Sequence, residues 1–91
     1  MAAFRTGFIG DRGHEDKGMR VSSAIAARFG QRIRELRIKK GLSQLEMAYQ
    51  FGIDRGHISE IETGKKNVCL PMLEVLSEGF GVSVSELMKG I

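Results

Sequence analysis

The sequence predicts an all-α fold, a compact domain of five short helices. Apolar residues recur every three or four positions from residue 23 onward, helix caps and stops separate these periods, and no alternating strand pattern competes. The chain has 91 residues, of which 42% are hydrophobic, so it can form one small core without a metal or disulfide. We expect one domain over residues 19–91 and a flexible tail at residues 1–18, where neither period is found.

The first helix is expected at residues 23–40. Its apolar stripe consists of Ile25, Phe29, Ile33 and Leu36. Basic side chains crowd its last turn, where they suit the negative end of the helix dipole, and Gly41 follows as the stop.

The second helix is expected to begin after Ser43, because Glu46 stands three residues later and completes a capping box. Met47, Ala48 and Phe51 share its apolar face. The small side chain of Ala48 allows the following helix to cross closely.

A tight turn leads into the third helix, which is expected at residues 55–63. Gly52 can adopt the left-handed conformation that ends a helix, and Asp54 can cap the next one, which stops at Gly64. Two short helices joined in this way predict a helix-turn-helix motif. The outward row of the third helix consists of Arg55, Gly56, Ser59 and Glu60.

The last two helices follow a basic loop. A fourth helix is expected at residues 70–79, where Pro71 is tolerated because the first turn needs no amide donor. Its apolar positions are Met72, Leu73, Val75 and Leu76. Ser83 or Ser85 then opens a short fifth helix that carries Leu87 and Met88.

The charge of the chain is unevenly distributed. Fourteen basic and eleven acidic residues give a net charge of +3, and residues 19–68 hold ten of the basic but only five of the acidic residues. A local positive field favours a polyanionic partner, although a solvated basic surface explains the same count.

The sequence also argues against several classes of protein. The single cysteine, Cys69, cannot form an internal disulfide, which favours a reducing cytoplasm unless Cys69 pairs between chains. Cys69, His14 and His57 lack metal-ligand spacing. No apolar run suits a membrane span or a signal peptide. No nucleophile arrangement or glycine-rich phosphate loop points to an enzyme. We expect no cofactor, metal, membrane or small-molecule ligand.

Residues 29–87 resemble the lambda-repressor-like, XRE-type helix-turn-helix family of small bacterial and phage DNA-binding regulators. The resemblance rests on spaced elements in the family's order: Ile33-Arg34-Glu35-Leu36-Arg37, Gly41-Leu42-Ser43-Gln44, Ala48, Gly52-Ile53, Ile58-Ser59, Glu62-Thr63-Gly64 and Phe80-Gly81-Val82-Ser83. Residues 53–62 and 66–68 also resemble the subgroup that includes controller proteins of restriction-modification systems.

The resemblance implies that the third helix enters the DNA major groove. The positions that meet base edges in the family are Arg55, Gly56, Ser59 and Glu60. Arg55 suits a bidentate contact with guanine, worth about 1–3 kcal/mol of discrimination, although a phosphate contact or a solvated arginine is the alternative. Glu60 can accept from a cytosine amino group, orient Arg55, or simply repel phosphate. Gly56 stands where the family often has a longer side chain, so one base contact is expected to be missing.

The resemblance also implies contacts with the DNA backbone, and these are assigned to Ser43, Gln44, His57, Lys65, Lys66 and Asn67. A surface role is the alternative for His57. Arg37 and Glu62 correspond to a partly buried ion pair between the first and third helices and are assigned to structure. Cys69 stands where the family usually has serine, and a buried, inert thiol is expected there.

The function implied is that of a sequence-specific transcriptional regulator that binds double-stranded DNA as a homodimer on a near-palindromic operator, with autoregulation as a hypothesis. The dimer interface is assigned to Val84, Leu87, Met88 and Ile91, for which core packing is the other use. The competing class is an antitoxin-like or other protein-interaction module with weak DNA binding.

Overall fold

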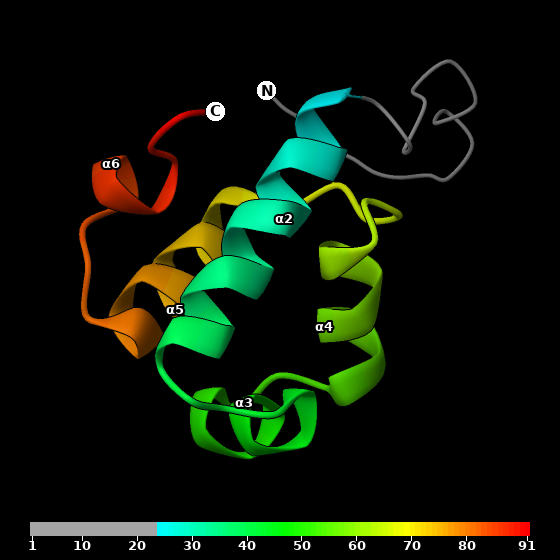
Figure 1. Ribbon diagram of the computed structural model, residues 1–91, viewed down its shortest axis with the longest axis vertical. Helices are drawn as coiled ribbons and strands as arrows, with labels where there is room; N and C mark the ends of the chain where they lie inside the picture. The colour runs from blue at the N-terminus through cyan, green and yellow to red at the C-terminus, as the bar shows by residue number, and fades with distance from the viewer. Residues whose placement is uncertain (1–23) are drawn as a thin grey trace, which may run out of the picture.

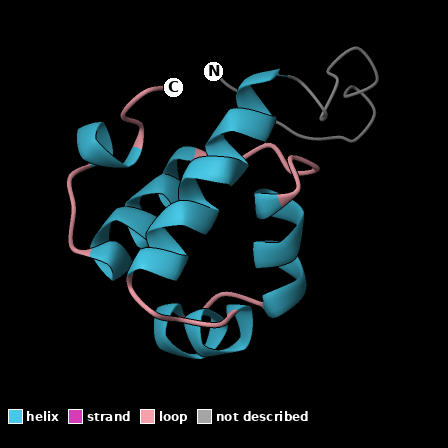
Figure 2. Ribbon diagram, viewed as in Figure 1, coloured by secondary structure: helices cyan, strands magenta, loops and turns pink. Residues whose placement is uncertain are grey.

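The computed structural model describes residues 24–91, which form five helices and no strand (Figures 1 and 2). The helices are α2 (Ala24–Lys39), α3 (Gln44–Phe51), α4 (Arg55–Glu62), α5 (Leu70–Phe80) and α6 (Val84–Leu87). The all-α class is therefore confirmed. The predicted tail at residues 1–18 and the helix start at Ser23 lie outside the described residues. Within residues 24–91, no helix combines the length and the apolar character that crossing a membrane requires.

The boundaries of α3 and α4 are set by the caps that the sequence predicts. Ser43 accepts a hydrogen bond from the Glu46 amide at 3.0 Å, while the Glu46 carboxylate accepts from the Ser43 amide at 2.8 Å. Gly52 ends α3 at φ 71°, and Asp54 then caps α4 by accepting from the His57 amide at 3.3 Å. The sharp turn between the two helices therefore follows from local chemistry.

The last two helices differ slightly from their predicted bounds. α5 extends through Phe80, one residue further than expected, before Gly81 turns the chain at φ 72°. Of the two serines that could open α6, Ser83 is the cap, since its hydroxyl accepts from the Glu86 amide at 3.0 Å.

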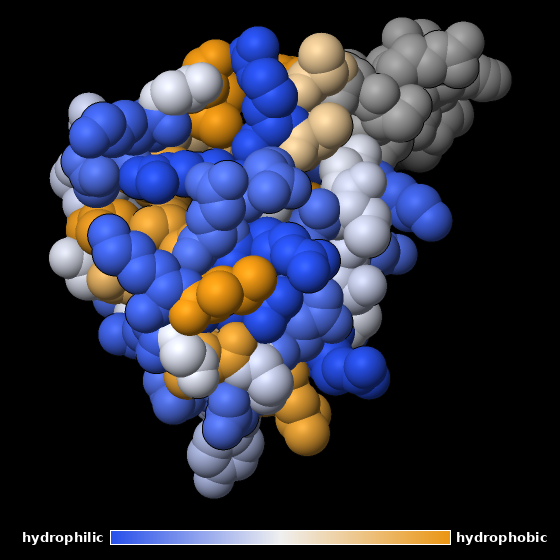
Figure 3. Space-filling view, in the orientation of Figure 1, coloured by the Kyte–Doolittle hydropathy of each residue, from blue (hydrophilic) through white to orange (hydrophobic). Residues whose placement is uncertain are grey.

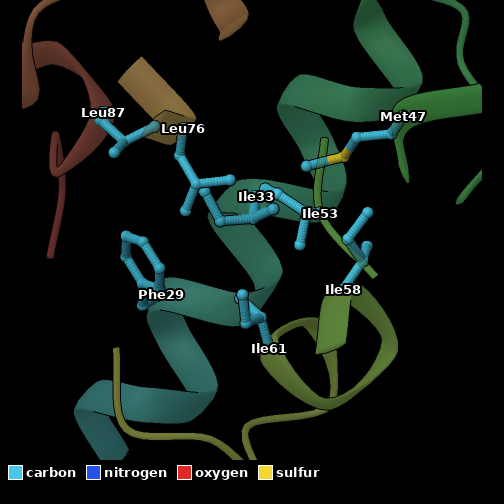
Figure 4. Close-up of a cluster of buried hydrophobic side chains, with 8 residues drawn as sticks. All are labelled: Phe29, Ile33, Met47, Ile53, Ile58, Ile61, Leu76 and Leu87. Carbon is cyan, nitrogen blue, oxygen red and sulfur yellow. The ribbon is translucent and has the colours of Figure 1, made fainter. Parts of the chain in front are cut away.

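The core draws on every described helix. Its members are Phe29, Ile33, Met47, Ile53, Ile58, Ile61, Leu76 and Leu87 (Figure 4). α2 lies against α4, α3 packs against both α4 and α5, and α6 packs against α5 (Figure 1). Burial of one side of each short helix, rather than helix propensity alone, holds the motif together.

Among the described glycines, Gly30 of α2 leaves the least room for a side chain. A β-carbon at this position would lie 2.2 Å from the main-chain oxygen of Ile61 and 2.8 Å from that of Glu62. Ala48, which the sequence pattern singled out for a close crossing, is partly buried and packs against the core. The contact between α2 and α4 therefore restricts position 30 to a residue without a β-carbon.

Two residues of the expected apolar stripes do not belong to the core. Ile25 is 54% exposed, because its turn of α2 precedes the crossing with α4. Val75 is 36% exposed, because α5 carries more apolar residues than the single face that packs inward can hold.

Candidate nucleic-acid interface

α4 presents one face to solvent and buries the other. Ile58 and Ile61 are buried, whereas Arg55, Gly56 and Glu60 are exposed. Ser59 and His57 are partly exposed between them. The outward row that the sequence predicts on the third helix is thus available to a partner that approaches α4 from outside.

A network of charged and polar groups fixes the end of α4. The guanidinium of Arg37 binds the Glu62 carboxylate through two hydrogen bonds, from Nε at 2.6 Å and from Nη2 at 3.0 Å. Arg37 also donates to the carbonyl of Leu42 at 2.8 Å, just before α3. Since the Glu62 side chain is only 2% exposed, this pair ties α2, α3 and α4 together in a nearly dry setting.

The same network shifts the titration of Arg37. Its hydrogen bond to Glu62 raises the pKa of the Arg37 guanidinium above its ordinary value, although burial opposes this effect. Arg37 therefore stays charged at neutral and mildly alkaline pH.

Gln44 lies within this network rather than apart from it. Its amide nitrogen donates to Glu62 at 3.0 Å. The sequence placed Gln44 on the DNA backbone and missed this role, because nothing in the spacing of residues 44 and 62 signals a contact across the motif. The amide nitrogen carries a second hydrogen, so Gln44 remains a candidate for a phosphate contact.

The amides at the start of α3 are partly occupied. The Glu46 carboxylate accepts a hydrogen bond from the Ser43 amide, which is one of the donors that an anion at this helix end would use. The Ser43 hydroxyl accepts from Glu46 and still has its own hydrogen to donate. A phosphate contact at Ser43 would therefore involve the side chain.

Glu60 has a partner in the loop that follows α4. Lys66 Nζ lies 3.3 Å from a carboxylate oxygen of Glu60, in a pair whose side chains are 40% and 51% exposed, respectively. The sequence assigned these residues to separate tasks, Glu60 to bases and Lys66 to phosphate. Lys65 and Asn67 are exposed beside them, so the basic loop lies next to the end of α4.

The turn after α4 brings this loop back. Gly64 has φ 76°, its amide donates to the Ile61 carbonyl at 3.1 Å, and the Lys65 amide donates to the Glu60 carbonyl at 2.8 Å. These two bonds form a Schellman motif, which reverses the chain after a helix. The reversal places Lys66 against the helix that the chain has just left.

Two arginines of the basic segment are committed to the fold. Arg28 donates to the main-chain oxygen of Ile91 at 2.6 Å. Arg32 donates to the carbonyls of Glu86 and Leu87 at 2.7 and 3.3 Å, and it also pairs with the Glu86 carboxylate. These contacts satisfy carbonyls at and beyond the end of α6, so the basic excess of residues 19–68 overstates the charge available to a polyanion.

The candidates for a dimer interface divide into core and surface residues. Leu87 was assigned to the interface, but it has 0% exposure and lies in the monomer core, because α6 turns it onto α5 and α2. Val84 is 42% exposed, while Met88 and Ile91 are partly buried against the core. Leu70 of α5 is 79% exposed, and the sequence pattern had not singled it out; the number of apolar residues along that helix was the available signal.

Apolar exposure on its own does not identify an interface here. Figure 3 shows a mostly hydrophilic face on which apolar atoms form separate patches, one of them over the front of α2.

Cys69 differs from its expected setting. It was expected to be buried, but the structure exposes it at the N-cap of α5, where its side chain makes no capping hydrogen bond. An N-cap residue stands at the edge of the loop, and this position outweighs the usual tendency of cysteine to be buried.

Comparisons with known proteins agree with this architecture. A helix-turn-helix domain model matches residues 30–91. The control protein C.MunI of a Mycoplasma species is 46% identical over 68 residues, which are 74% of this chain and 92% of that protein. The crystal structure of the restriction-modification controller protein C.AhdI from Aeromonas hydrophila has a TM-score of 0.68 at 40% identity, covering 71% of this chain and 98% of that chain.

A third comparison includes nucleic acid. The structure of the C.Esp1396I controller protein tetramer, in complex with its natural 35 base-pair operator, has a TM-score of 0.65 at 30% identity and covers 72% of this chain and 91% of that chain. Together with the turn at Gly52 and the outward face of α4, these matches place the chain. It belongs to the XRE-type helix-turn-helix family of DNA-binding transcriptional regulators, with restriction-modification controller proteins among its relatives.

Proposed function

We propose that this regulator binds a near-palindromic operator as a homodimer, with α4 of each protomer in the major groove. The observation that carries the proposal is the division of α4 into a buried side, held by the Arg37–Glu62 pair, and an exposed polar side. A helix fixed in this way presents its side chains to base edges at a constant angle.

Base reading is assigned to Arg55, Ser59 and Glu60, with Gly56 as a point of close approach. Arg55 is exposed at the first position of α4, and the first turn of a recognition helix reaches deepest into the groove. Its two outer nitrogens match the O6 and N7 acceptors of guanine. Ser59 lies one turn further along, where a hydroxyl can donate or accept.

Contacts with the DNA backbone are assigned to residues around both ends of the motif, namely Ser43, Gln44, His57, Lys65, Lys66 and Asn67. Ser43 and Gln44 lie at the start of α3, and the three loop residues follow α4. Such contacts would set the position of α4 on the duplex without reading its sequence.

Dimerisation is proposed because one recognition helix makes too few base contacts for a selective site. Val84 offers exposed apolar surface on α6, and Met88 and Ile91 lie partly exposed beyond it. The C.Esp1396I relative binds its operator as a tetramer, which supports assembly on DNA as the mode of action.

The regulated genes are proposed to include those of a restriction-modification system and the gene of this chain itself. C.AhdI and C.Esp1396I are restriction-modification controller proteins. We further propose a cytoplasmic, regulatory protein that has no catalytic role and needs no cofactor or small ligand, so that its concentration sets the response.

Selection of binding sites from random duplexes, followed by sedimentation of the protein with and without the selected site, tests this proposal. We expect a two-fold symmetric consensus, two protomers per site at least, and affinity that falls steeply with salt as phosphate contacts release counterions. Absence of a consensus, or affinity for DNA that does not change with salt, would instead support a protein-interaction module.

A further inference from the structure

We propose that the Glu60–Lys66 ion pair opens when the protein binds DNA, and that this exchange of partners raises the selectivity of DNA binding. In the free protein each side chain holds the other, and on the operator each exchanges its partner for a DNA group. This inference rests on the proposed function, in which α4 enters the major groove and the following loop meets the backbone.

The geometry of the pair is built into the end of α4. The Schellman turn at Gly64 reverses the chain, and the Lys65 amide bonds the Glu60 carbonyl at 2.8 Å. Lys66 therefore starts beside the main chain of the residue whose carboxylate it meets at 3.3 Å. Since the turn positions both partners, the pair can reform after each opening without rearrangement of the fold.

The pair is weak enough to open. Its side chains are 40% and 51% exposed, and ion pairs in that setting contribute little because water screens them. A DNA phosphate carries a full negative charge and can replace Glu60 as the partner of Lys66. The contacts that Lys66 and Glu60 make with DNA can therefore compensate for the opening of the ion pair.

Selectivity arises from what happens to Glu60 after Lys66 leaves. A carboxylate in the major groove can accept from the N4 amino group of cytosine, so an operator with cytosine at that position supplies a new partner. On other duplexes Glu60 is left unpaired among phosphates, which is unfavourable for a carboxylate that is losing its water. The loss of Lys66 is therefore compensated on the operator alone.

A double-mutant cycle with Glu60→Gln and Lys66→Met tests the exchange, with dissociation constants measured for the selected operator and for a random duplex at fixed salt. Glu60→Gln should strengthen binding to random DNA by roughly two- to fivefold, which is the range expected when one exposed pair no longer competes. It should not strengthen binding to the operator. The dissociation constant for the random duplex, divided by that for the operator, should therefore fall. In the Lys66→Met background, the gain on random DNA should become smaller, because the part that comes from opening the ion pair is then absent.

Persistence of the whole gain in the Lys66→Met background would overturn the exchange, because it would show that Glu60 merely repels phosphate. Glu78→Gln is the matched control, since it makes the same change of charge on an exposed position of α5. It should leave the ratio unchanged, and an equal effect there would also overturn the proposal. Failure of the wild-type protein to prefer any site would refute the proposed function itself, which is a separate outcome.

Discussion

Arg55 and Arg37 are chemically the same residue, and the fold uses them in opposite ways. Arg37 is enclosed by Glu62 and the carbonyl of Leu42, so its donors serve the motif. Arg55 is exposed at the first position of α4, and its donors point to no described partner. Burial, rather than residue type, separates a structural arginine from a candidate reader of DNA.

Replacing Arg55 with glutamine should weaken operator binding by about 1–3 kcal/mol and relax the preference at one base pair in each half-site. The reason is the loss of a bidentate contact that glutamine cannot make to guanine. Competition binding with a set of single-base operator variants measures both effects. Arg34→Gln, an exposed change on α2, is the control. An equal loss of affinity for every sequence would identify Arg55 as a phosphate contact instead.

Replacing Arg37 with methionine should lower the free energy of unfolding by about 3 kcal/mol, because it leaves the nearly buried Glu62 carboxylate without its main partner. Urea unfolding followed by circular dichroism gives the value. The double variant Arg37→Met, Glu62→Met should be more stable than the single variant, since no charge is then stranded. A double variant that is less stable still would contradict this account.

The pH dependence of the Arg37 contribution follows from the direction of its shift. Its pKa is raised in the folded state, so its stabilisation is fully present below the unfolded pKa and is lost only as pH rises through the folded one. Both values lie in the strongly alkaline range. Arg37 should therefore add no slope to the stability of the protein between neutral and mildly alkaline pH.

At the scale of the elements, each helix boundary depends on a few neighbouring residues. Ser43 and Glu46 satisfy each other's amides at the start of α3, and Gly52 ends the same helix in the left-handed region. Since such signals lie within four residues of the boundary, the sequence predicted these boundaries to within one residue.

Ser43→Ala should destabilise the protein by about 1 kcal/mol, because it removes half of the capping box of α3. Thermal unfolding with a van't Hoff analysis detects a change of this size. Ser85→Ala is the matched control, since Ser85 is exposed within α6 and caps no helix. Equal losses in both variants would mean that the box contributes nothing specific.

Gly30→Ala tests the crossing of α2 and α4. The added methyl group would meet main-chain oxygens of Ile61 and Glu62, which cannot move aside as a flexible side chain can. We expect a loss of about 1–3 kcal/mol despite the better helix propensity of alanine. Gln31→Ala, at the exposed neighbouring position, should be close to neutral in the same urea titration. A stabilised Gly30→Ala variant would show that the two helices separate easily.

The whole molecule has one core shared by all five described helices, so residues far apart in the chain depend on each other. Leu87, near the end of the chain, lies in the same cluster as Phe29 and Ile33 of α2. Arg28 and Arg32 reinforce that contact by binding carbonyls at and beyond the end of α6. α6 is thereby an integral part of the fold as well as a neighbour of the proposed interface.

Leu87→Ala should lower the free energy of unfolding by about 2–5 kcal/mol, because it opens a cavity in the core. Val84→Ala is the matched control on the same helix, and its exposed side chain should cost less than about 1 kcal/mol of folding stability. Urea titrations at several protein concentrations separate folding from association. A Leu87→Ala variant with normal stability but impaired association would show that Leu87 acts in the dimer interface.

Much of the fold and part of the site could be predicted from the sequence. The five helices, the turn at Gly52 and the outward row of α4 depend on periodicity and caps, which are local. The ion pair of Arg37 and Glu62 was implied by family resemblance, since no local signal joins positions 25 residues apart. The pairing of Glu60 with Lys66 could have been sought at the Gly64 stop, because a Schellman turn returns the chain to its helix.

The sequence by itself determined the bounds of α3, α4 and α5 to within one residue and which family of regulators the chain resembles, because caps, glycines and apolar spacing act over a few residues. Only the tertiary structure decided which polar side chains remain free for DNA. It committed Arg28 and Arg32 to partners within the protein, it joined Gln44 to Glu62 through one of its two amide hydrogens, and it placed Leu87 in the core. The physical reason is that burial and pairing depend on distances across the fold, which no local pattern encodes.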